Sequence, residues 1–89
     1  MPTVYILQLQ KGKKYVGYTN NYIKRMKSHF NGKGSKVTQK YKPVCVIKTI
    51  PCFSKAYGLA VEKNITLVFA EKYGWSNVRG SYWCNSTNF

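Results

Sequence analysis

Carboxylates are scarce in this chain. Its 89 residues include two acidic residues, against fifteen lysines and arginines, one histidine and eight tyrosines. Glu62 and Glu71 are expected on one helix, where their spacing turns them to opposite sides. This excludes paired-carboxylate glycosidase chemistry and argues against a two-metal centre, which needs several converging acids. His29 has no obvious acidic partner for a hydrolase triad, and the chain contains no Walker loop or dinucleotide fingerprint.

Glu62 is the better of the two acids as a metal ligand. It lies mid-helix between Val61 and Ile65, in apolar surroundings where burying a carboxylate is costly. Glu71 lies beside Lys72 in the last turn, which is typical of a solvated charge. One carboxylate suits a single Mg²⁺ or Mn²⁺ that keeps most of its waters. Such an ion would neutralise charge on a phosphate, while an arginine holds the phosphate and a tyrosine or histidine activates water.

Two further pairs of residues are candidates for this chemistry, and each has a structural alternative. Arg25 and His29 are spaced i, i+4, so they share one helix face and would both reach a phosphate. A solvated basic face would have the same spacing. Tyr5 and Tyr15 lie on neighbouring strands of an expected hairpin, where they are either catalytic candidates or simple cross-strand aromatics.

The hairpin that would position the two tyrosines is predicted from β-branched and aromatic residues. Residues 4–9 and 14–19 read as its strands, and Gly12 in the turn between them is free to take a positive φ. Gly17 within the second strand indicates the close approach of another backbone or of a ligand. We therefore count Gly17 among the candidate nucleic-acid contacts.

Two capped helices and a third strand complete the expected framework. Asn20 is expected to cap a helix over residues 21–30, residues 44–50 form a strand, and Ser54 is expected to cap a helix over residues 55–73. The residues expected to face the core are Ile23, Met26, Lys27 and Phe30 in the first helix, and Ala56, Leu59, Ala60, Lys63, Leu67 and Ala70, widened by Val61, Ile65 and Val68, in the second.

The remaining segments are basic and are expected at the surface. Residues 32–43 read as a loop with at most one helical turn, and residues 75–84 as an aromatic return segment. Candidate phosphate contacts in these two segments are Lys33, Lys36, Lys40, Lys42 and Arg79. The predicted fold is α+β, a three-stranded antiparallel sheet flanked by helices. It forms one domain over residues 1–84 with a tail at 85–89.

A net charge of +13 indicates a polyanionic partner. Nucleic acid is the commonest such partner, and an anionic membrane surface is the alternative. The basic residues are spread over the whole length, whereas membrane-surface binding calls for an amphipathic helix. We therefore expect nucleic acid rather than a membrane as partner, and no small-molecule cofactor. Charge by itself supports binding only, since a ribosomal-type structural protein has the same balance.

Cysteine content and the N-terminus bear on the compartment. Three cysteines cannot all pair within one chain, and their spacings fit no zinc pattern. The chain also lacks a signal-peptide pattern and an apolar run long enough to span a bilayer. These features favour free thiols in a reducing compartment, which is the cytoplasm, or the nucleus if the host is eukaryotic.

The ordered set of candidate residues resembles the GIY-YIG nucleases. Val4-Tyr5-Ile6 and Tyr15-Val16-Gly17 are similar to the paired motif that names the family, with Thr3 or Val4 in place of the first glycine. Arg25 and His29 match its arginine and histidine, Glu62 its metal-binding glutamate, and Asn77 its late asparagine. The resemblance covers residues 3–83. Within the superfamily, residues 15–32 and the basic stretch 34–38 are similar to Slx-type structure-specific endonucleases, here without their zinc-binding domain.

The resemblance implies an activity and roles for these residues. It implies metal-dependent hydrolysis of a DNA phosphodiester that leaves 5′-phosphate and 3′-hydroxyl ends, with Glu62 on the metal. A motif tyrosine would activate water, His29 would relay or accept the proton, and Asn77 would belong to the catalytic set. The Slx-type likeness implies branched or nicked DNA, weak sequence specificity, and a role in repair or recombination. The alternative is a non-catalytic basic nucleic-acid-binding protein that retains the fold.

Overall fold

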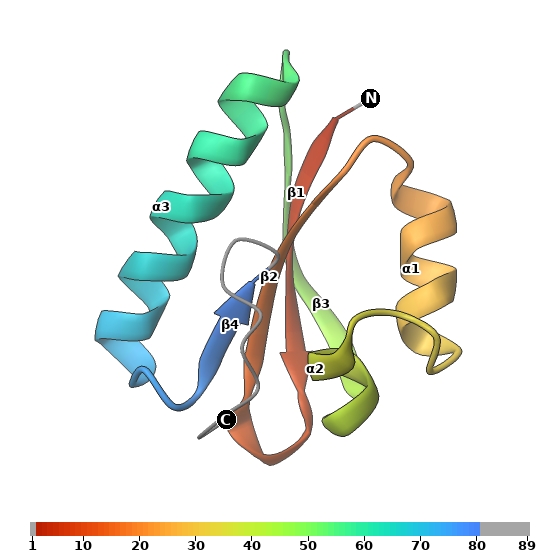
Figure 1. Ribbon diagram of the computed structural model, residues 1–89, viewed down its shortest axis with the longest axis vertical. Coiled ribbons are helices and arrows are strands. Elements are labelled where there is room, and N and C mark those ends of the chain that lie inside the picture. The colour runs from red at the N-terminus through yellow and green to blue at the C-terminus, as the bar shows by residue number, and fades with distance from the viewer. Residues whose placement is uncertain (1, 81–89) are drawn as a thin grey trace.

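A sheet of four strands lies between α3 on one face and α1 with α2 on the other (Figure 1). The structure, a computed structural model, describes residues 2–80. The strand order is β3-β1-β2-β4. The strands are β1 (Thr3–Leu9), β2 (Lys14–Thr19), β3 (Pro43–Pro51) and β4 (Val78–Gly80), and the helices are α1 (Tyr22–Phe30), α2 (Lys36–Lys40) and α3 (Lys55–Tyr73). The predicted α+β class is confirmed.

The fourth strand shows that the expected three-stranded antiparallel sheet is wrong. β1 pairs antiparallel with β2 and β3, whereas β4 pairs parallel with β2, so the sheet is mixed. β4 is three residues long and follows α3, which carries the chain back to the edge of β2. So short a strand gives no alternating pattern, and its pairing partner is more than sixty residues away in the chain. The predicted return segment therefore begins with a strand.

The predicted hairpin is confirmed, and its register fixes the centre of the molecule. Tyr5 on β1 lies opposite Gly17 on β2, and Leu7 lies opposite Tyr15. The turn between the strands is a short 3-10 segment, Gln10–Gly12, in which Gly12 has a φ of 73°. Gly12 thus takes the positive φ expected of it.

Alternation along β1 divides the core into two layers. Tyr5, Leu7 and Leu9 point to the α1 and α2 side, where they pack with Tyr15 and Val37. The other layer lies under α3 and consists of Val4, Ile6, Val16 and Cys52, with Val61, Ile65 and Phe69 packed against it. The candidate tyrosines therefore share the layer beneath α1.

Helix α1 presents a different face to the core from the one predicted. It begins at Tyr22, because the side chain of Asn21, and not that of Asn20, caps it by accepting the amide of Lys24. Ile23 is 68% exposed and Phe30 is also exposed. The inward face instead consists of Tyr22, Met26 and His29, and Lys27 is exposed. Apolar periodicity does not predict this face, because the most deeply buried residue on it is a histidine.

Helix α3 has the predicted bounds, with Ser54 as its cap and Gly74, at a φ of 99°, at its end. Its predicted inward face is largely wrong. The buried residues are Gly58, Glu62, Thr66 and Ala70, while Leu59, Lys63 and Val68 are exposed. Apolar residues surround this helix, so periodicity does not single out a face. A close approach at Gly58 decides it, because a Cβ there would lie 2.4 Å from the Tyr18 ring.

The basic loop predicted over residues 32–43 contains one short helix, α2, where at most one helical turn was expected. Ser35 caps α2 by accepting the amide of Thr38. Cys45 and Cys52 carry free thiols, as expected, while Cys84, the predicted domain end at residue 84 and the tail at 85–89 lie outside the described residues. Within residues 2–80, no helix combines the length and apolar character needed to cross a membrane.

Candidate active site

A chain of buried hydrogen bonds links the first strand to the first and second helices. The Tyr5 hydroxyl lies 2.7 Å from His29 Nε2, and His29 Nδ1 lies 3.0 Å from Thr38 Oγ1. Tyr5 points off β1, His29 sits in the last turn of α1, and Thr38 is in α2, so three elements converge here. The exposed fraction of His29 is 0%. The solvated-face alternative for His29 is therefore wrong.

Tyr15 and Arg25 complete this cluster. The Tyr15 ring meets the His29 ring edge-on, with centroids 5.4 Å apart, and lies 6.4 Å from the Tyr5 ring. The Arg25 guanidinium lies close enough to the side chains of both tyrosines to interact with them electrostatically. Burial alone would lower the pKa of Arg25, but its contacts with Tyr5 and then Tyr15 outweigh burial and raise that pKa. Arg25 is thus a fixed positive charge beside two hydroxyls.

Gly17 makes room for the Tyr5 ring. A Cβ at this position would lie 2.2 Å from Tyr5 Cζ and 2.3 Å from its hydroxyl oxygen. The close approach predicted at Gly17 is therefore real, but the approaching group is the catalytic candidate itself. Gly17 is buried, so a direct contact with nucleic acid, its predicted role, does not fit. It acts by placing Tyr5.

Glu62 approaches the same site from the opposite face of the sheet. Its exposed fraction is 2%, and its charge raises the pKa of both Tyr5 and Tyr15, as a minor contribution after burial. A Cβ at Gly80 would lie 2.7 Å from Thr66 Oγ1 and from the Val16 carbonyl oxygen, and 3.3 Å from Glu62 Oε2, so glycine lets β4 pass close to the Glu62 side chain. A carboxylate oxygen is the type of ligand that Mg²⁺ and Mn²⁺ prefer. Within residues 2–80, no group of three or more His, Cys, Asp or Glu side chains forms a metal cluster.

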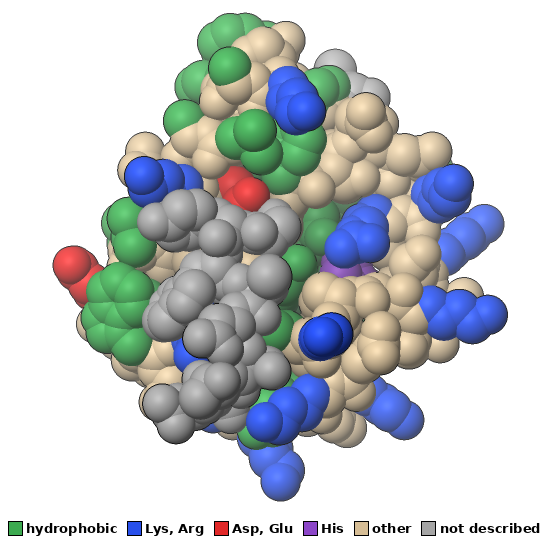
Figure 2. Space-filling view, viewed as in Figure 1, with side chains coloured by type: hydrophobic (Ala, Val, Ile, Leu, Met, Phe, Trp, Pro, Cys, Tyr) green, Lys and Arg blue, Asp and Glu red, His purple; other side chains and the backbone are tan. Residues whose placement is uncertain are grey.

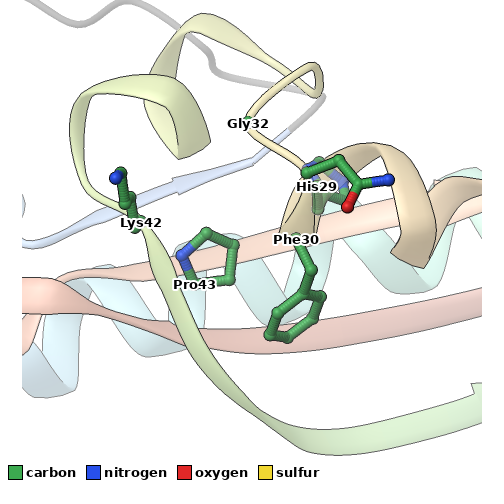
Figure 3. Close-up of a pocket in the computed structure, with 6 residues that line it drawn as sticks. His29, Phe30, Gly32, Lys42 and Pro43 are labelled. Atoms are coloured by element: carbon green, nitrogen blue, oxygen red, sulfur yellow. The ribbon is translucent and has the colours of Figure 1, made fainter.

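The predicted lysines lie at the surface around this site. Lys33, Lys36, Lys40 and Lys42 are all exposed. In the space-filling view, lysine and arginine side chains gather on the side of α1 and α2, whereas apolar side chains gather over α3 (Figure 2). An open hollow of about 220 Å³ beside His29 is lined by Phe30, Asn31, Gly32, Lys42 and Pro43. Across it, Lys42 and Pro43 face the end of α1 (Figure 3).

Two candidate residues late in the sequence, Asn77 and Arg79, form hydrogen bonds away from the tyrosine cluster. Asn77 donates to the Tyr73 carbonyl and accepts from Lys13 Nζ, at 2.8 and 3.1 Å, so it joins the end of α3 to the hairpin turn. None of its hydrogen bonds reaches the tyrosine cluster, and its catalytic role stays a prediction. Arg79 is buried and donates to the carbonyls of Trp75 and Val78. Because the Arg79 guanidinium is buried and donates to backbone carbonyls, it does not suit the phosphate contact predicted for it.

Thr38 and Ser35 belong to the site but were not among the candidate residues. Both lie in the basic stretch 34–38, whose charge and likeness to Slx-type endonucleases point to its lysines and not to these two hydroxyls. The signal that could have found them is the cap pattern, in which Ser35 precedes a short helix and Thr38 follows three residues later. A Cβ at Gly34 would lie 2.3 Å from His29 Nδ1, so this stretch passes directly over the imidazole.

His29 should make the stability of the protein depend on pH. Burial, and then the charge of Arg25, lowers the pKa of His29 from 6.5 to about 4. The unfolded chain therefore takes up this proton at a higher pH than the folded one does. Stability should be complete above pH 6.5 and should fall as the pH drops from 6.5 toward 4, by on the order of 3 kcal/mol.

Denaturant unfolding at pH 7 and pH 4.5 measures this effect. His29→Gln is the control, because it removes the chain's one histidine and should flatten the difference between the two pH values. A wild-type protein whose free energy of unfolding is the same at both would show that His29 titrates normally in the folded state.

Comparisons with known proteins place this geometry in a family. The chain matches the GIY-YIG catalytic domain over residues 1–73, which include Tyr5, Tyr15, Arg25, His29 and Glu62. A UPF0213 protein of Bacillus licheniformis is 46% identical over 50 residues, 56% of this chain and 50% of that protein. One of Halalkalibacterium halodurans is 41% identical over 62 residues, 70% of this chain and 66% of that protein.

A UPF0213 protein of Bacillus velezensis is 33% identical over 72 residues, which cover 78% of this chain and 73% of that protein. The chain spans half the length of the Bacillus licheniformis relative. No solved structure matches the chain.

Proposed function

The chain belongs to the GIY-YIG family, and we propose that it is a divalent-metal-dependent endonuclease that hydrolyses a phosphodiester bond of DNA. Membership of the family implies nuclease activity. The observation that carries the proposal is the buried hydrogen bond between Tyr5 and His29, 2.7 Å long, beside the positive charge of Arg25. A tyrosine aimed at a neutral imidazole, beside a fixed positive charge, suits proton removal from water next to a phosphate.

Tyr5 and His29 are proposed to activate the attacking water together. Burial, and then the charge of Tyr15, raises the pKa of Tyr5 above its ordinary value, so the hydroxyl keeps its proton at neutral pH. A resting phenolate is therefore not the base. As the water oxygen bonds to phosphorus and the bond to the leaving 3′ oxygen breaks, the water proton passes to the Tyr5 oxygen. The Tyr5 proton passes to His29 Nε2 at the same time, which avoids a free phenolate, and the leaving 3′ oxygen takes up a proton from solvent water to become the 3′-hydroxyl.

Arg25, and a metal ion held by Glu62, are proposed to stabilise negative charge on the reacting phosphate. Arg25 donates to a non-bridging phosphate oxygen, where a positioned donor stabilises the charge that develops in the transition state. Glu62 would hold the metal ion, Mg²⁺ or Mn²⁺, which when bound supplies a further positive charge at the phosphate. The proposal that both act at one phosphate is supported by the charge of Glu62, which acts on Tyr5 and Tyr15, and by the close packing of the Tyr5 ring on Gly17.

The substrate is proposed to be branched or nicked DNA, as the Slx-type likeness of residues 15–38 implies. The curated relatives described above are UPF0213 proteins, a name that states no activity. Exposed lysines on α2 and its flanking segments suit phosphate contacts, which position a protein on DNA without reading its sequence. We therefore propose that the isolated chain has weak sequence specificity and prefers flaps, nicks or junctions, with a role in repair or recombination.

One set of incubations tests the proposal. Supercoiled plasmid, a flap, a four-way junction and plain duplex of matched sequence are each incubated with Mg²⁺, Mn²⁺ or EDTA. We expect cleavage with either metal, none with EDTA, and the highest initial rates on the branched substrates. Undiminished cleavage in EDTA would contradict metal dependence. A single cut site on plain duplex, unchanged when the branch is moved, would instead indicate a sequence-specific enzyme.

DNA binding should weaken steeply with salt, because bound lysines and arginines displace condensed counterions. Four exposed lysines, at positions 33, 36, 40 and 42, together with Arg25 would give about five contacts. A plot of log affinity against log salt should then have a slope near −5, from about −0.9 per contact. Fluorescence anisotropy in EDTA measures the slope without cleavage. Lys42→Ala should make the slope shallower by about 1, and a wild-type slope shallower than about −2 would mean that most lysines face away from the DNA.

A further inference from the structure

We propose that Thr38 is a positioning residue that fixes His29 in the one neutral tautomer able to accept the Tyr5 proton. The proposal rests on the proposed function, in which His29 takes that proton. Neutral imidazole has one nitrogen that donates and one that accepts, and the hydrogen bond at one nitrogen sets the role of the other. Thr38 contacts the nitrogen that faces away from Tyr5. It therefore acts on the reaction through His29 and without touching the substrate.

The hydrogen bonds of Thr38 decide which partner donates. Its hydroxyl donates to the Ser35 carbonyl at 3.1 Å, so its proton is engaged there, and its oxygen also lies 3.2 Å from the Ser35 hydroxyl, which can then donate to it. One lone pair of Oγ1 is left for His29 Nδ1, 3.0 Å away. His29 Nδ1 must carry the proton and donate it to this oxygen. Nε2 is left bare, and it accepts the Tyr5 hydroxyl at 2.7 Å.

The opposite tautomer would disturb both ends of this chain of bonds. A bare Nδ1 could be satisfied only if Thr38 turned its proton away from the Ser35 carbonyl. A protonated Nε2 would face the proton of Tyr5, which that tyrosine keeps at neutral pH because its pKa is raised by burial. Two buried polar groups would then lose their partners, and such losses are expensive where water cannot replace them.

Local structure holds Thr38 and His29 together. Ser35 caps α2, and its side-chain oxygen accepts the Thr38 amide at 3.2 Å while its carbonyl accepts the Thr38 hydroxyl. Both Thr38 and His29 have exposed fractions of 0%. A Cβ at Gly34 would lie 2.3 Å from His29 Nδ1 and 2.8 Å from Thr38 Oγ1, so only glycine lets the backbone pass this closely over the pair.

Nitrogen NMR of the histidine ring tests the tautomer directly and needs no DNA. The chain has one histidine, so protein labelled with ¹⁵N-histidine gives a single ring to assign. At pH 7 we expect the wild type to show a protonated Nδ1 and an unprotonated Nε2. Thr38→Val, which removes the acceptor, should move the population toward protonated Nε2, and Thr38→Ser should restore the wild-type spectrum. A wild-type ring protonated at Nε2 would overturn the proposal whether or not the protein cuts DNA.

Cleavage rates form the second arm of the test. Thr38→Val should lower the rate at saturating DNA by at least about 10-fold, as expected when a group that orients a proton acceptor is lost, while the binding of DNA in EDTA stays unchanged. Thr38→Ser should retain most of the rate. Thr49→Val, at an exposed site on β3, is the matched control and should change neither readout. If Thr38→Val cuts as well as wild type, or if Thr38→Ser fails to rescue, the proposal is wrong. A wild type that fails to cut while its ring shows the expected tautomer counts against the proposed nuclease function alone.

Discussion

Glu62→Gln is expected to abolish metal-dependent cleavage and to leave DNA binding within a few-fold. The substitution keeps the size and shape of a side chain that is 2% exposed, but it removes the negative charge that a divalent cation needs. An amide oxygen is a far weaker ligand for Mg²⁺ than a carboxylate. The rate should fall by more than about 100-fold, the scale for losing a positioned electrostatic partner of the transition state. Binding is spared because the exposed lysines supply the phosphate contacts.

Glu71→Gln is the control for this prediction. It makes the same charge change nine residues further along α3, at an exposed position, and should cut like wild type. Plasmid nicking in Mg²⁺ gives the rate, anisotropy in EDTA gives the affinity, and thermal unfolding shows that both variants are folded. Mg²⁺-dependent nicking by purified Glu62→Gln protein would rule out Glu62 as the essential metal ligand.

Local signals predicted the elements of this fold well. The hairpin follows from alternating apolar residues around Gly12, and α3 follows from the cap at Ser54 and the stop at Gly74. These signals act between neighbours in the chain, so one sequence is enough to read them. No such local signal predicts β4, because its three residues are held in place by pairing with β2 and by the hydrogen bonds that Arg79 donates to backbone carbonyls.

The inward faces of the helices were harder to predict because the active site is buried. Apolar periodicity assigns the core to apolar residues, yet α1 buries His29 and α3 buries Glu62 and Thr66. His29 lies inside because it bonds Tyr5 and Thr38, and Glu62 and Thr66 lie inside because they pack against the short strand at Gly80. A rule based on hydrophobicity places them outside and turns Ile23 and Val68 inward, where neither belongs.

The candidate residues of the site were predictable in type but not in arrangement. Spacing could not separate a solvated Arg25–His29 face from a functional one, whereas the structure shows that His29 is not solvated, since it bonds Tyr5 and Thr38. Basic residues were assigned to DNA by charge alone. The exposed Lys42 remains free to make such a contact, and this stays a prediction, whereas the guanidinium of Arg79 closes the turn before β4.

Tyr5→Phe should lower the cleavage rate by about 10²- to 10⁴-fold, the usual contribution of a positioned proton-transfer group. Tyr15→Phe should lose much less. Both substitutions delete one hydroxyl from a ring that is 1% exposed, so the pair is closely matched. The difference lies in the contact with His29, because the Tyr5 hydroxyl meets His29 Nε2 whereas Tyr15 meets the edge of the His29 ring with its own ring. Deleting the Tyr15 hydroxyl leaves the path from water to His29 intact.

The pH dependence of the wild-type cleavage rate distinguishes proton transfer through Tyr5 to His29 from its alternatives. His29 accepts a proton only while it is neutral, and its pKa of about 4 keeps it neutral well below pH 6.5. The rate at saturating Mg²⁺ should therefore change little between pH 8 and pH 6, and should fall only as the pH approaches 4. A proton acceptor with the ordinary histidine pKa would lose about three quarters of its rate by pH 6.

Single-turnover rates of the wild type, Tyr5→Phe and Tyr15→Phe over this pH range test both the role of Tyr5 and the pH profile. A larger loss in Tyr15→Phe than in Tyr5→Phe would assign the water to Tyr15, and a fall in the wild-type rate near pH 6.5 would show that His29 is open to solvent when DNA is bound.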